Sequence, residues 1–122
     1  MKYMMFIKHP EQHRSEPIPE GLLEAMGEFV QSGFKSGILR ETSGLKSSKE
    51  GARVRLEGGK LHVIDGPFTE AKEVVGGFAI VEVKSKEEAM DVAQQFMELH
   101  RKHWPAFVGE CEVRPFEDDP PQ

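Results

Sequence analysis

The sequence predicts an α+β domain in which two helices cover one face of an antiparallel sheet. Stretches beginning at Pro19 and at Ser85 carry apolar residues at three- and four-residue spacing, which is typical of amphipathic helices. Short runs rich in β-branched and aromatic residues flank both stretches. Two further runs are separated by Gly58-Gly59, a strong local signal for a β-hairpin.

The expected elements follow one another in the order β-α-β, hairpin, β-α-β. Pro19 suits a first helical turn, and Gly33 and Gly37 offer places for that helix to end. Ser85 stands three residues before Glu88, the spacing of a capping box. This order is that of a ferredoxin-like split βαβ fold with an inserted hairpin. The predicted strands are 3–8, 38–42, 52–57, 60–64, 77–83 and 111–116.

Length and charge limit the organisation of the chain. Its 122 residues suffice for one domain, which we place at 1–116, followed by an acidic, proline-rich tail at 117–122 that we expect to be disordered. The net charge of −5 argues against nucleic acid as a partner. No apolar window approaches the roughly 20 residues that cross a bilayer, so we expect no membrane partner.

The cysteine content and the N-terminus favour a cytoplasmic location. Cys111 is the only cysteine, so an intrachain disulfide is impossible. Glu110 and Glu112 beside it would raise the pKa of the thiol, which makes a strand residue a better interpretation than a nucleophile. The apolar run at the N-terminus is too short for a secretory signal.

Two of the strands predict a homodimer. Residues 3–7 and 78–83 are apolar on both faces, whereas a strand with one face in water alternates apolar and polar residues. Two helices cover one face only, so the other face would expose a large apolar patch. Packing of two sheets about a two-fold axis, as a dimeric α+β barrel, would bury it. Alternatively, loop 42–51 or segment 66–76 folds over that face.

The segment from Val63 to Phe78 carries a family resemblance. It contains Asp65-Gly66-Pro67-Phe68 and, further on, Gly76-Gly77-Phe78. This stretch resembles the signature of the DGPF family, a branch of the YCII-related proteins, and both ends of the chain are also similar to that family. The resemblance implies a ferredoxin-like dimeric barrel and assigns no reaction.

Relatives in this family suggest two different roles. Some YCII-like proteins are thought to use a His–Asp pair with the His on the first helix. Met26 stands at that position here and cannot transfer a proton, so the resemblance does not extend to this pair. Other relatives are encoded beside extracytoplasmic-function sigma factors, which implies an accessory or regulatory role.

Asp65 and His9 are the candidate catalytic residues. Asp65 ends a strand, where its carboxylate could act as a general base, although an Asp before Gly-Pro ordinarily caps a turn. His9 would be a second titratable group at the mouth of a pocket formed by the first strand, the first helix and segment 64–78. The predicted pocket and motif residues are Phe6, Met26, Gly66, Pro67, Phe68, Gly76, Gly77 and Phe78.

The remaining patterns predict neither a metal nor a cofactor. His100 and His103 are three residues apart on a helix, yet no third ligand stands at motif spacing. We interpret them as positive charges that complement the negative end of that helix. The sequence lacks a dinucleotide or phosphate-loop motif.

Two functional hypotheses remain. The first is a dimer that binds a small molecule, with acid/base chemistry at the pocket. The second is a non-catalytic accessory or regulatory module that binds a protein. A cavity with a His or carboxylate pointing into it favours the first, whereas a shallow surface with Asp65 capped by backbone amides favours the second.

Overall fold

The structure is a computed structural model that describes residues 1–117. The predicted tail at 117–122 therefore lies outside the described residues, apart from Glu117. Between residues 1 and 117, no helix has the length and apolar character needed to span a membrane. The elements are β1 (Lys2–His9), η1 (Glu11–Ser15), α1 (Glu20–Ser36), β2 (Leu39–Gly44), η2 (Ser48–Glu50), β3 (Ala52–Glu57), β4 (Lys60–Asp65), β5 (Val74–Glu82), α2 (Lys86–His103) and β6 (Glu110–Pro115).

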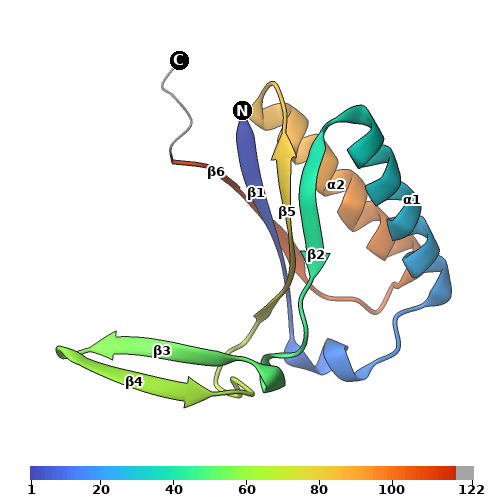
Figure 1. The fold of residues 1–122 in the computed structure, drawn as a ribbon. Coiled ribbons are helices and arrows are strands. Elements are labelled where there is room, and N and C mark those ends of the chain that lie inside the picture. Colours follow the sequence, from blue (N-terminus) through green and yellow to red (C-terminus); the bar gives the residue numbers. More distant parts are fainter. Residues whose placement is uncertain (118–122) are drawn as a thin grey trace.

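The main sheet has four strands in the order β2-β5-β1-β6, and all neighbouring pairs are antiparallel. Helices α1 and α2 lie together on one face of this sheet (Figure 1). This arrangement confirms the predicted α+β, ferredoxin-like fold. Strands β3 and β4 pair only with each other and form a separate hairpin, residues 52–65, which we call the arm.

The helices begin and end where local chemistry allows. Pro19 precedes the first turn of α1, and Gly37 follows its last turn with a φ of 84°, a left-handed conformation that favours glycine. The hydroxyl of Ser85 accepts a hydrogen bond from the backbone N–H of Glu88 at 3.1 Å. Gly33 does not end α1. A Cβ there would lie 3.0 Å from the Cβ of Leu39, so glycine at this position lets β2 approach the helix closely.

The core lies between the sheet and the helices. Tyr3 and Met5 of β1 and Val81 of β5 are buried there together with Ala89 and Ala93 of α2. The two alanines lie four residues apart, hence on one face of the helix, and their small side chains allow α2 to pack closely against the strands. The buried residues therefore match the apolar stripe predicted for this helix.

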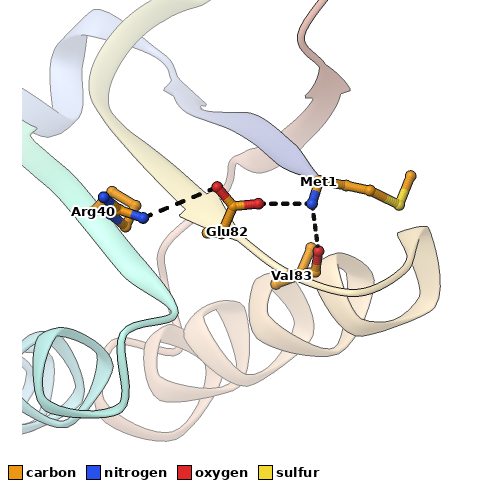
Figure 2. A network of polar contacts seen from close by, with 4 residues as sticks. All are labelled: Met1, Arg40, Glu82 and Val83. Carbon is orange, nitrogen blue, oxygen red and sulfur yellow. Dashed lines mark hydrogen bonds and ion pairs between the residues drawn. The ribbon is translucent and has the colours of Figure 1, made fainter. Parts of the chain in front are cut away.

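A polar cluster joins the starts and ends of three strands. The amino group of Met1 donates to the carboxylate of Glu82 at 2.6 Å and to the carbonyl of Val83 at 2.8 Å. Arg40, near the start of β2, lies 4.0 Å from the other oxygen of Glu82 (Figure 2). Glu82 thus links β1, β2 and β5 at one end of the strands.

The face of the sheet without helices, which we call the open face, has an apolar centre. Met4 pairs with Ile80 and Phe6 with Phe78, and these four side chains are only partly buried in the single chain. On the neighbouring strand, Glu112 stands opposite Phe6 and Arg114 opposite Met4. The open face therefore has apolar residues at its centre and charged residues beside them.

Candidate functional site

A cavity of about 330 Å³ lies between the main sheet and the two helices. Its volume is at the lower end of the range for small-molecule sites. The strands contribute Met5 and Ile7 together with segments 42–44 and 76–79, which include Phe78. The helices contribute mainly apolar side chains: Leu22, Met26, Phe29, Val30, Val92 and Phe96.

Two buried histidines border this cavity, and each forms a hydrogen bond with the described chain through one of its two ring nitrogens. His9 at the end of β1 is 5% exposed, and His100 in the last turn of α2 is 6% exposed. Nδ1 of His9 donates to the carbonyl of Pro10 at 2.8 Å, and Nδ1 of His100 donates to the carbonyl of Phe96 at 3.1 Å. These bonds place the proton on Nδ1. In the neutral ring each Nε2 then offers a lone pair, and the described side chains provide neither of them with a hydrogen-bond partner.

His13 has a different role, because both of its ring nitrogens are occupied. Nε2 accepts from the backbone N–H of Val108 at 3.2 Å, and Nδ1 donates to the carboxylate of Glu16 at 2.9 Å. Its ring stacks on Phe107, with 5.1 Å between the ring centroids. It also forms an edge-to-face contact with the ring of His9, with 6.0 Å between the centroids. His13 is thus a positioning residue that holds the ring of His9 in place.

The surroundings of His100 favour its neutral form. Burial lowers the pKa of its imidazole, and the nearby His9 lowers it further, whereas the hydrogen bond to Phe96 acts in the opposite direction. The ring of His100 also lies 4.7 Å from that of Phe107. His100 therefore differs from the sequence prediction, which made it a positive charge at the end of the helix. It is a buried imidazole on the cavity wall, where its surroundings favour the neutral form.

The predicted site residues fall into two groups. His9, Met26, Gly76 and Gly77 border the cavity, and so does Phe78, which reaches it through its backbone because its side chain lies with Phe6 on the open face. Phe6, Asp65, Gly66, Pro67 and Phe68 do not border it.

Asp65 lies at the exposed end of β4, where its carboxylate makes no hydrogen bond or ion pair with another described residue. The expected turn cap is therefore not formed.

His100 was missed as a site residue. The signal for it is its place four residues after Phe96, on the inner stripe of the second helix.

The Asp65–Phe68 segment fastens the arm to the end of β1. The N–H of Phe68 donates to the hydroxyl of Ser48 at 3.2 Å, and this hydroxyl donates to the carboxylate of Glu11 at 2.6 Å. The N–H of Gly66 donates to the carbonyl of Gly51 at 2.9 Å. A Cβ on Gly66 would lie 1.6 Å from the carbonyl oxygen of Ser48, so no larger residue fits in this backbone arrangement.

Glu11 is the centre of this anchor. One carboxylate oxygen accepts from Ser47 and twice from Ser48, while the other is buried and has no partner among the described residues. Burial acts to raise the pKa of Glu11, but these hydrogen bonds outweigh it and leave the pKa below its ordinary value. Glu11 is thus an ionised link between the chain just after His9 and the base of the arm.

Cys111 borders the cavity but is a poor nucleophile. Burial raises the pKa of its thiol to about 11, so the thiolate is scarce at neutral pH. This confirms the predicted direction of the shift, whereas its cause is burial and not the neighbouring Glu110 and Glu112. Within residues 1–117, no group of three or more His, Cys, Asp or Glu side chains is arranged to hold a metal ion.

His100 is expected to make the protein less stable in acid. Because its pKa is lowered from the ordinary 6.5, folding favours the neutral ring. That stabilisation is complete above the pKa of the unfolded chain and is lost as the pH falls through 6.5 toward the folded value. A histidine NMR titration should place the midpoint of His100 below 6.5. His100→Phe should lose less stability than wild type between neutral and acidic pH, and an equal loss would contradict this assignment.

Gly66→Ala is expected to destabilise the protein by about 1–3 kcal/mol, the usual cost of overpacking. The new methyl group collides with the backbone of Ser48 and disturbs the anchor of the arm. Gly27→Ala in α1 is the matched control, because apart from its chain neighbours and the backbone of its own helix no described atom lies within 4 Å of its added Cβ. Urea denaturation of both variants measures the difference. Equal stability of the two would show that the close approach is not a constraint.

Comparison with known proteins identifies the family of this chain. The YCII-related domain profile matches residues 1–102. The chain is also 28% identical, over 104 residues, to a protein of Rhizobium meliloti (strain 1021) described as uncharacterized. That alignment covers 85% of this chain and 77% of the relative. The profile match confirms the resemblance seen in the sequence. Because it covers well over half of the chain, the protein belongs to the YCII-related domain family.

Proposed function

We propose that this protein binds a small, mainly apolar molecule in the cavity and that Nε2 of His9 or of His100 accepts a hydrogen bond, and then the proton, from a donor group of that molecule. The observation that carries the proposal is the pair of buried imidazoles on the wall of one apolar cavity, each with an Nε2 that no described side chain engages. Each Nε2 can accept one hydrogen bond, so a ligand with a single hydroxyl group would satisfy one ring and a ligand with two donors would satisfy both.

The surroundings define the class of ligand. Apolar side chains on both helices favour an aromatic or aliphatic body. A charged group far from the histidines would lose its hydration without compensation, so the ligand should be neutral except at its donor. The donor should lie at the histidine end, because both lone pairs are there. A hydroxylated aromatic molecule is the simplest chemistry with these properties.

The two histidines suit proton transfer. A neutral imidazole accepts a proton at Nε2 while the bond at Nδ1 fixes the orientation of the ring. A lowered pKa also helps His100 to release the proton again near neutral pH. Asp65 lies outside the cavity and takes no part in this proposal. The cavity favours a small-molecule role over the accessory role, for which a shallow surface is expected.

The proposal includes a homodimer that buries the open face. Met4, Phe6, Phe78 and Ile80 form the apolar centre of this face, and Glu112 and Arg114 stand beside it. An apolar centre with polar residues at the rim is the usual anatomy of a protein interface. A second copy is the natural partner, because a two-fold axis lets the same surface serve both chains.

Binding can be tested with two probes that differ in one hydroxyl group, para-fluorophenol and fluorobenzene. Wild type is expected to bind the phenol about fivefold more tightly, the effect of one net hydrogen bond of about 1 kcal/mol. NMR of the methionine methyl groups locates the probe, because Met5 and Met26 border the cavity while Met90 lies exposed on α2.

The matched variants are His100→Phe in the cavity and His62→Phe on the exposed arm. His100→Phe should lose most of the preference for the phenol, whereas His62→Phe should retain it. The proposal fails if the probes shift Met90 and not Met26, or if His100→Phe discriminates as wild type does.

The homodimer can be tested with Met4→Lys, which places a charge at the centre of the open face. Sedimentation equilibrium should show a wild-type dimer at micromolar concentration and a dissociation constant at least about tenfold higher for the variant. Met90→Lys, on the outer surface of α2, is the control and should leave the dimer unchanged. A wild-type monomer at micromolar concentration would contradict the proposed assembly.

A further inference from the structure

The arm exposes a second apolar surface, separate from the open face. Val54 pairs with Val63 and Leu56 with Leu61, so these four side chains share one face of the hairpin. Each of them is between 68% and 72% exposed. Monomeric proteins rarely leave such a contiguous patch in water.

Beyond its base, the arm packs against no other helix or strand of the described chain. β3 and β4 contact each other, and neither contacts a helix or a strand of the main sheet to a comparable extent. Isolated two-stranded hairpins are only marginally stable in water. Some further surface is therefore needed to hold this hairpin in its extended form.

The base of the arm, in contrast, is held firmly. Arg53 forms an ion pair with Glu70 at 2.9 Å, and its guanidinium lies 3.8 Å from the centre of the Phe68 ring. Ser48 and Glu11 connect the same segment to the end of β1. This anchor fixes the direction of the arm. It extends away from the helical layer, toward the side of the sheet that carries the open face (Figure 1).

We infer that the apolar face of the arm docks on a second copy of this chain and clasps the partner seated on the open face. This inference rests on the proposed homodimer. A copy placed against the open face lies beside the arm, because the arm extends on the side of the sheet away from the helices (Figure 1). The two-fold axis then gives each chain one arm that clasps and one body that is clasped.

The areas support a second copy as the occupant. The four side chains of the arm expose on the order of 300 Å² of apolar surface. A stable interface needs about 800 Å² from each partner, so the arm alone is too small. The open face adds further partly exposed apolar side chains on the same side of the sheet. A single partner that covers both surfaces at once therefore accounts for the arm and the sheet together.

The test compares two double variants on opposite faces of the arm. Leu56→Ser with Leu61→Ser removes one apolar cross-strand pair, and Arg55→Ser with His62→Ser removes the neighbouring pair on the other face. Both pairs are exposed, so neither change disturbs the core. Circular dichroism checks that both proteins fold. Sedimentation equilibrium then measures the dissociation constant of each homodimer.

We expect the Leu56/Leu61 variant to raise the dissociation constant at least about tenfold, while the Arg55/His62 variant stays near wild type. If wild type is a dimer and the Leu56/Leu61 variant associates equally well, the clasp is overturned while the homodimer stands. Equal weakening by both variants also overturns the clasp, because the apolar face would then have no special part. A monomeric wild type would overturn the homodimer and the clasp together.

Discussion

The whole structure depends on one packing constraint, which is that two helices cover only one face of a four-stranded sheet. On the covered face, Ala89 and Ala93 bring α2 close to Tyr3 and Val81, and the core closes there. Toward the end of α2, larger rings such as Phe96 replace the alanines and the cavity opens. On the other face the apolar side chains remain uncovered. Core, cavity and open face are thus consequences of the same arrangement of layers.

The chemistry of the cavity comes from how three histidines are hydrogen-bonded. His13 has partners at both nitrogens and serves as a fixed part of the wall. His9 and His100 each bind a backbone carbonyl through Nδ1, and within the described part of the chain the opposite nitrogen has no partner. The hydrogen-bond partners of the three histidines therefore separate His13 from the other two. The apolar surroundings of His100 favour its neutral form.

The segment that resembles the family signature contributes to the architecture. Gly66 passes so close to the backbone of Ser48 that a side chain would not fit, and the N–H of Phe68 completes the anchor to Glu11. A distinctive motif thus has a physical reason that requires no chemistry at Asp65. Its effect is to direct the arm, which links this segment to the proposed assembly more closely than to the cavity.

The sequence by itself determined the elements, because helix periodicity, the Ser85 cap and the Gly58-Gly59 turn are local signals. It also determined that the first strand is apolar on both faces. Only the tertiary structure decided which residues meet. His9 and His100 are about ninety positions apart in the chain, and the pairing of β1 with β6 and the packing of α2 bring them to one cavity. The sequence made Asp65 a candidate catalytic residue alongside His9, yet the anchor holds Asp65 on the exposed arm. Propensity and capping act over a few neighbouring residues, whereas burial and pKa depend on contacts between distant parts of the chain.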